Sequence, residues 1–132
     1  MLPNHYVYPA IFTYETNGIS ILFPDLPGCL PSGKNEEDAI RNATEALGLH
    51  LFGMEQDKEK IPSPSKIQEL VVTTGSAVVL IDVFMPPIRD AALNKSIKKT
   101  LTIPAWLNYK AEKANVNFSK ILQDSLIKYL NL

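Results

Sequence analysis

The polar side chains best placed to contact a nucleic acid alternate along a short stretch near the end of the chain. Lys98, Thr100 and Thr102 occupy every second position, and mostly apolar residues alternate with them. A period of two is the pattern of a β-strand with one polar and one apolar face. Two such strands, paired, would present a doubled polar row on a ribbon narrow enough to enter the major groove of DNA.

The elements that must position this row are a strand over 97–103 and two helices behind it. Pro104 ends the strand and suits the first turn of a helix, where its missing N–H costs nothing. A second helix is expected to start near Ser119, a good N-cap residue. Apolar residues recur at helical spacing in both segments: Leu107, Ala111 and Ala114 in the first, and Ile121, Leu122, Leu126, Tyr129 and Leu130 in the second.

One strand and two short helices cannot bury this much apolar side chain, and a single strand has no ladder partner. Both problems disappear if two copies pair their strands antiparallel and interleave their helices. The segment resembles the ribbon-helix-helix class of DNA-binding proteins, through its alternating strand and through 118–120 at the start of the second helix. The resemblance implies that Lys98, Thr100 and Thr102 read base edges, and that Ser119 and Lys120 lie at a phosphate. The alternative is an ordinary edge strand on a small helical subdomain.

Charge is divided unevenly along the chain. Residues 1–86 hold five Lys/Arg against eleven Asp/Glu, a balance of −6, whereas residues 87–132 hold eight against three, a balance of +5. A basic tail on an acidic body fits a polyanion at one end and a basic partner at the other. Either half alone could equally be a solvated surface.

The first part of the chain reads as strands, then a helix, then a strand. Residues 6–15 and 19–23 are expected to form a hairpin about Asn17-Gly18, with a short third strand near 30–32. Asn35 is the expected N-cap of a long helix. The near-continuously apolar stretch 76–84 predicts a strand covered on both faces, and Pro86-Pro87 is expected to close the domain. The helix is expected to bury one stripe, with Ala39 and Ala46 flanking it: Ile40, Ala43, Leu47, Leu51 and Met54.

This part is similar to the HicB antitoxin family. The similarity is carried by Tyr8-Pro9-Ala10, by the proline-rich turn at 23–29, by Gly33, and by the helix from Glu36 through Leu47. It implies an α+β protein with a partial, degenerate RNase H-like β-β-β-α-β domain over 1–86, a linker over 87–96, and a ribbon-helix-helix domain over 97–132. The implied partners are a small basic RNA-cleaving toxin of the HicA type, operator DNA, and a second copy through the C-terminal domain. A higher assembly with the toxin is left open.

Within the proline-rich turn, Asp25 and Cys29 have chemically interesting side chains. Asp25 is expected to accept a backbone hydrogen bond in the turn, with contact to a basic toxin as the alternative. Cys29 is the only cysteine, so neither an intrachain disulfide nor a cysteine-based metal cluster is possible. Because neither histidine has an evident link to Cys29, a small buried apolar side chain is the favoured interpretation over a nucleophile.

An RNase H-like fold raises the possibility that the chain itself cleaves nucleic acid. That chemistry holds two metal ions on clustered carboxylates, but the first strand contains no acid before its end, and Asp25 and Asp82 are scattered. We therefore expect no enzyme activity, metal site or cofactor. A repressor without a toxin partner is the other alternative. With no signal-peptide core and no run of membrane-spanning length, the protein is expected to be cytoplasmic.

Overall fold

The computed structural model describes all 132 residues and divides into two compact units, Met1–Lys95 and Ser96–Leu132. The first is built from β1 (His5–Glu15), β2 (Gly18–Leu22), β3 (Ser32–Gly33), α1 (Glu36–Gln56), a 3-10 turn η1 (Ile67–Glu69), β4 (Ser76–Phe84) and α2 (Met85–Asn94). The second contains α3 (Ala105–Lys113) and α4 (Phe118–Tyr129).

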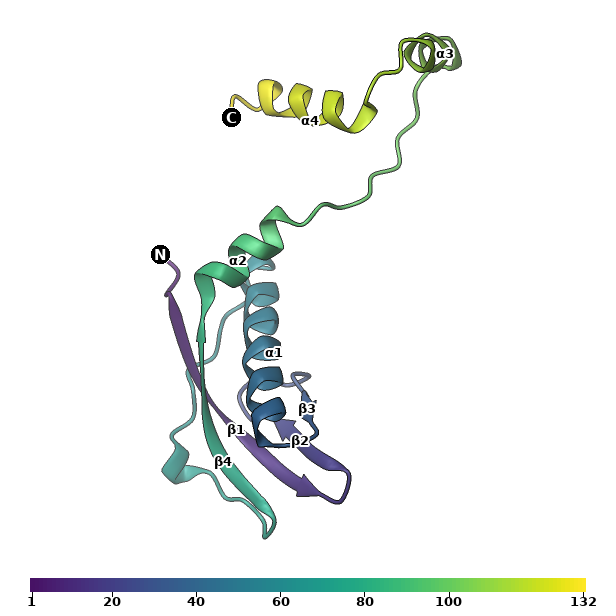
Figure 1. Cartoon of the computed structure of the whole chain (residues 1–132). Coiled ribbons are helices and arrows are strands. Elements are labelled where there is room, and N and C mark those ends of the chain that lie inside the picture. The colour runs from purple at the N-terminus through teal and green to yellow at the C-terminus, as the bar shows by residue number, and fades with distance from the viewer. The chain divides into compact units, whose positions relative to one another are not determined.

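The four strands form one antiparallel sheet in the order β3-β2-β1-β4, and α1 packs along one of its faces (Figure 1). The chain is therefore α+β, and its β-β-β-α-β order is the predicted one. The β1–β2 hairpin also forms, but its turn lies one residue earlier than expected. Glu15 pairs with Gly18, so Thr16 and Asn17 make the turn. Gly18 has a φ of 149°, and a Cβ there would lie 2.7 Å from the carbonyl oxygen of Gly33.

The core lies between the sheet and α1. Alternate residues of the strands point at the helix, as the period of two predicts. The buried apolar side chains of the core come from β1, from β2 with the turn after it, from α1, and from β4 with Met85: Tyr8, Ala10, Phe12, Ile19, Ile21, Phe23, Leu26, Cys29, Ala39, Ala43, Leu47, Leu51, Ile81, Val83 and Met85.

The buried stripe of α1 differs from the predicted one at both ends. Ile40 is 46% exposed, and Ala39, expected to flank the stripe, takes the buried position instead, while Met54 is only partly buried. A Cβ on Gly33 would lie 2.4 Å from the backbone of Ala39, so β3 and the start of α1 are in very close contact. Only a small residue fits at that contact. The stripe therefore follows the spacing of four through Ala39, Ala43, Leu47 and Leu51, as listed above.

Two predictions about the end of the first unit are wrong. β4 is covered on one face only, because Leu80 and Phe84 are 53% and 49% exposed on the face turned away from α1. Pro86-Pro87 does not end the unit, because the two prolines lie in the first turn of α2, where proline is tolerated. The predicted linker over 87–96 is thus mostly helical, and the first unit extends to Lys95.

In the second unit, both predicted helices are present, but residues 96–104 carry no strand. A strand is defined by the hydrogen bonds of its ladder, and the single chain offers this segment no partner. Pairing with a second copy stays a prediction.

Candidate functional site

The residues predicted to read DNA lie in the irregular segment before α3. Lys98, Thr100 and Thr102 are all exposed, and no hydrogen bond or ion pair engages their side chains. Leu101 and Ile103, the apolar residues between and beyond them, are 58% and 42% exposed. The polar row is therefore available to a ligand, while the apolar row lacks a covering layer within the single chain.

The predicted phosphate site lies at the start of α4. The helix begins at Phe118, and its N-cap is Asn117 rather than Ser119: the Asn117 side chain accepts a hydrogen bond from the backbone N–H of Lys120 at 3.1 Å. Asparagine is among the best N-caps because its short amide reaches this N–H. Lys120 forms an exposed ion pair with Asp124 at 3.5 Å, one helical turn on. Such a pair is weak and leaves the ammonium free to exchange partners.

A groove of about 650 Å³ lies between the 99–103 segment and the two tail helices. Its lining is mainly apolar, and no residue of α3 or α4 is buried. Many large apolar side chains of the tail are at least 42% exposed: Ile97, Leu101, Ile103, Trp106, Leu107, Tyr109, Phe118, Ile121, Leu126, Ile127, Tyr129, Leu130 and Leu132. A 37-residue unit whose helices have no buried residue lacks the packing that usually stabilises so small a fold.

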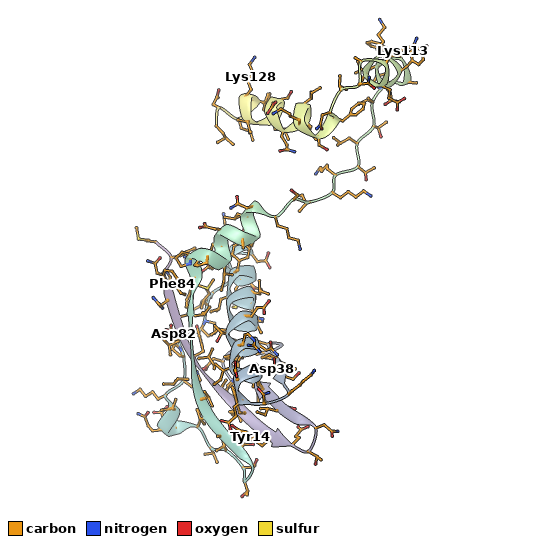
Figure 2. The ribbon with its side chains drawn as sticks, viewed as in Figure 1. Tyr14, Asp38, Asp82, Phe84, Lys113 and Lys128 are labelled. Atoms are coloured by element: carbon orange, nitrogen blue, oxygen red, sulfur yellow. The ribbon has the colours of Figure 1, made fainter.

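The outer side of α3 carries two aromatic–lysine pairs. The Lys110 ammonium lies 5.9 Å from the ring centre of Trp106, and that of Lys113 lies 4.8 Å from the ring centre of Tyr109. Lys113 projects away from the helix axis in Figure 2. Both distances are within reach of a cation–π interaction, which stabilises an exposed site by about 0.5–1 kcal/mol.

In the first unit, the half-buried carboxylate of Asp25 already has partners. It accepts the backbone N–H of Ser65 at 2.9 Å and the Ser65 hydroxyl at 2.6 Å. The backbone acceptor role expected for Asp25 is thus directed at a residue 40 positions on, not at its own turn. These bonds hold the segment after α1 against the proline-rich turn. A role for Asp25 in toxin contact stays untested.

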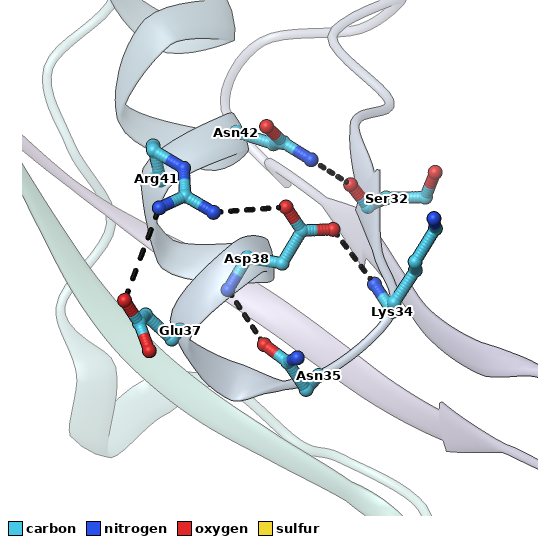
Figure 3. Close-up of polar contacts among 7 residues, drawn as sticks. All are labelled: Ser32, Lys34, Asn35, Glu37, Asp38, Arg41 and Asn42. Carbon is cyan, nitrogen blue, oxygen red and sulfur yellow. Dashed lines mark hydrogen bonds and ion pairs between the residues drawn. The ribbon is translucent and has the colours of Figure 1, made fainter.

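The acidic start of α1 forms a local polar network (Figure 3). Asn35 caps the helix by accepting the N–H of Asp38 at 2.8 Å, as predicted. The Asp38 carboxylate accepts the Lys34 N–H at 2.9 Å and pairs with Arg41 at 3.1 Å. These contacts hold the pKa of Asp38 below its usual value, the Lys34 hydrogen bond contributing most. The Asn42 amide donates to the Ser32 carbonyl at 2.8 Å and so joins α1 to β3.

The other chemically reactive groups are scattered. Asp82 pairs with His5 at 3.0 Å, and no three His, Cys, Asp or Glu side chains converge to form a metal site. Cys29 is 4% exposed, which raises the pKa of its thiol and disfavours the thiolate. The interpretation of Cys29 as a buried apolar side chain is confirmed.

A cluster of hydrogen-bonded side chains around the buried carboxylate of Glu55 joins α1, α2 and β1. Arg89 donates two hydrogen bonds to Glu55, from Nε at 2.9 Å and from Nη2 at 2.7 Å, and the Tyr6 hydroxyl donates to the same carboxylate at 2.8 Å. The Glu55 side chain is only 1% exposed. Arg89 lowers the pKa of Glu55, while burial and the hydrogen bond to Glu55 raise that of Tyr6 to about 12. The cluster holds α2 against α1.

Comparison with known proteins decides the family. A family model described as "HicB_like antitoxin of bacterial toxin-antitoxin system" matches residues 8–124, which is most of both units. The chain belongs to this family. Membership confirms the similarity seen in the proline-rich turn and in α1.

Individual relatives of this HicB-like chain include a named HicB antitoxin. Antitoxin HicB 2 of Photorhabdus laumondii is 31% identical over 71 residues, 54% of this chain and 51% of that antitoxin. An uncharacterized 14.9 kDa protein of Haemophilus phage HP1, from its rep-hol intergenic region, is 27% identical over 110 residues, 81% of this chain and 80% of the relative. Among solved structures, a chain of the toxin-antitoxin complex from Streptococcus pneumoniae has a TM-score of 0.63 and 25% identity, covering 95% of this chain and 99% of that chain.

Sequence reasoning missed two features of this HicB-like chain. Glu55 and Arg89 are 34 positions apart in the sequence, and the residues around each of them do not predict that they pair. The Asn117 cap could have been found, because Asn-Phe-Ser-Lys offers two N-cap candidates two residues apart.

None of the helices has the length and apolar character that a membrane-spanning segment needs.

Proposed function

We propose that this chain is the antitoxin of a toxin–antitoxin pair. It binds and neutralises a small basic HicA-type toxin that cleaves mRNA, and it represses its own operon by binding operator DNA as a dimer. It acts as a binding protein and not as an enzyme, in the cytoplasm where both partners would be found. The family match carries the antitoxin part of this proposal, and the uncovered groove of the tail carries the dimer.

Toxin neutralisation is assigned to the first unit. Met1–Lys95 has its own core and carries seven Lys/Arg against twelve Asp/Glu, a balance of −5. Opposite charge speeds the encounter with a basic protein, whereas packing determines the lifetime of the complex. The structural relative from Streptococcus pneumoniae is described as a toxin-antitoxin complex, which supports a toxin partner.

Dimerisation and DNA binding are assigned to the tail. Two copies that pair residues 97–103 antiparallel would supply the missing ladder and place the apolar row of each strand over the groove. Lys98, Thr100 and Thr102 of both strands would then face the bases. The N-terminus of α4, with Ser119 and Lys120, would bind a phosphate through its free N–H groups.

The test of the antitoxin role is RNA cleavage by a cognate HicA-type toxin, with and without the protein. We expect full-length protein to suppress cleavage, and residues 1–95 to retain most of that effect. If the toxin cleaves equally well in the presence of excess protein, the antitoxin role is refuted, and a repressor without a toxin partner becomes the better description.

Sedimentation tests the dimer. Full-length protein should be a dimer at micromolar concentration, whereas removal of residues 97–132 should leave a folded acidic domain with weaker self-association and no DNA binding. A full-length monomer at micromolar concentration would contradict the pairing of the tail strands.

A further inference from the structure

The outer edge of β4 lacks the devices that usually protect a sheet edge. β4 is nine residues long and pairs only with β1, and no other backbone hydrogen bond engages residues 77–84. It contains no lysine, proline or glycine, and Asp82 is its only charged residue. The opposite edge of the sheet is β3, which has two residues and offers little to pair with. Natural proteins rarely leave a long apolar edge strand uncovered.

The sheet face beside this edge is apolar and half exposed along β4, although Pro9, which pairs with Leu80 on the same face, is buried. Leu80, Asp82 and Phe84 alternate along β4 and so share the face turned away from α1. Val7 lies across from Asp82 on β1 and is 43% exposed, while Leu80 and Phe84 are about half exposed. Asp82 and Phe84 follow one another along the same part of β4 in Figure 2. We call the outer edge of β4 and these four exposed side chains the β4 surface.

The charge at the centre of the β4 surface indicates its partner. The Asp82 side chain is 60% exposed among apolar neighbours, and its one ionic contact is His5, which is charged only when protonated. A lysine or arginine brought against Asp82 would be partly desolvated by these neighbours, which strengthens the ion pair. A second copy of this chain would instead bring another unit of balance −5 and another Asp82. Like charges across strands or interfaces are unfavourable.

We propose that the β4 surface is the docking site of the basic toxin, which adds its own apolar and cationic side chains, and a strand edge, to β4. This inference rests on the proposed antitoxin function and specifies its contact residues. It also explains why β4 has the composition of a strand covered on both faces although one face is open. Apolar side chains at the centre of such an interface contribute most of its affinity.

The test measures binding of a cognate HicA-type toxin, in catalytically inactivated form, to the full-length protein by titration calorimetry. Leu80→Lys should weaken binding at least about ten-fold, because it places a cation in an apolar contact facing a basic partner. Asp82→Lys should weaken binding as well and reduce its dependence on salt. Ile40→Lys is the matched control, since Ile40 is 46% exposed on α1, away from the β4 surface. It should change affinity less than about three-fold.

The outcomes separate this inference from the proposed function. If wild-type protein does not bind the toxin, the antitoxin function and the docking site both fail. If wild type binds, and Leu80→Lys and Asp82→Lys bind as tightly, only the docking site is overturned. It is also overturned if Leu80→Lys lowers the sedimentation coefficient of the free protein without affecting toxin binding, because a second copy would then cover β4. Thermal unfolding of each variant verifies that it is folded, which is expected for half-exposed positions.

Discussion

Replacing Arg89 by methionine should destabilise the first unit by about 3 kcal/mol. The Glu55 carboxylate is 1% exposed and receives two hydrogen bonds from Arg89. Removing the arginine leaves a buried charge whose only remaining donor is the Tyr6 hydroxyl. Breaking a buried ion pair from one side costs about 3–5 kcal/mol. We take the lower end, because the Arg89 side chain is 17% exposed and water can partly replace it.

The pH dependence of this loss follows from the depressed pKa of Glu55. The folded-state pKa lies below the unfolded value, so the pair contributes its full stability above the unfolded pKa of about 4.3. That contribution is lost as the pH falls through the folded pKa. In the Arg89→Met variant the carboxyl is more easily protonated. The difference between wild type and variant should therefore be largest near pH 7 and shrink below about pH 4.

Urea unfolding followed by far-UV circular dichroism measures the difference, with fluorescence of Trp106, the only tryptophan, as a separate probe of the tail. Arg41→Met is the control, because Arg41 is an exposed arginine that pairs with Glu37 and Asp38 and should have little effect. A loss below about 1 kcal/mol at pH 7, or one that is the same at pH 3, would refute the assignment of Glu55 and Arg89 as a buried stabilising pair.

The remaining predictions concern nucleic acid. Lys98→Ala or Thr100→Ala should each weaken binding to operator DNA by about 1–3 kcal/mol and reduce the preference for the operator sequence. If a gel-shift series shows an unchanged preference, these side chains do not read the bases. Lys120→Ala should weaken all DNA evenly and lower the slope of log affinity against log salt by about one, measured by anisotropy. Purified protein with magnesium or manganese should not cleave RNA, and Asp25→Asn and Asp82→Asn should change nothing catalytic; metal-dependent cleavage lost in Asp82→Asn would point to a nuclease.

Local patterns were sufficient to predict β1, β2, α1 and β4 of the first unit. The Asn17-Gly18 hairpin signal, the Asn35 cap and the apolar spacing of α1 each depend on residues close in sequence. The hairpin, the cap and the helix are all present in the structure. Burial of Ala39 in place of the predicted Ile40 depends instead on the contact with Gly33 of β3. Tertiary contact therefore determined which face of the helix is buried.

The end of the first unit was harder to predict. Pro86-Pro87 satisfies the rules both for a domain end and for the first turn of a helix, and the local sequence does not distinguish them. The choice is made by buried Met85 and by the distant Glu55–Arg89 pair, which hold α2 in place. The candidate site was hard to predict for a similar reason. Residues 97–103 have the sequence of a strand, but the single chain offers this segment no ladder partner.

The first unit has its own buried core and the tail does not. This difference predicts that folding of the tail depends on protein concentration. The first unit has a core of buried residues, whereas no residue of α3 or α4 is buried. Helices of nine and twelve residues are marginal without packing. If pairing of the tails supplies that packing, tail folding is linked to dimer formation by mass action, and folding of the first unit is not.

Amide hydrogen exchange at two protein concentrations tests this linkage. On dilution below the dimer dissociation constant, α3 and α4 should lose protection while β1, β4 and α1 keep theirs. Toxin binding by the first unit should then persist at concentrations where DNA binding is already lost. If the tail stays equally protected at both concentrations in a protein shown to be monomeric, the tail folds without a partner. If both units lose protection together, folding of the first unit also depends on the dimer.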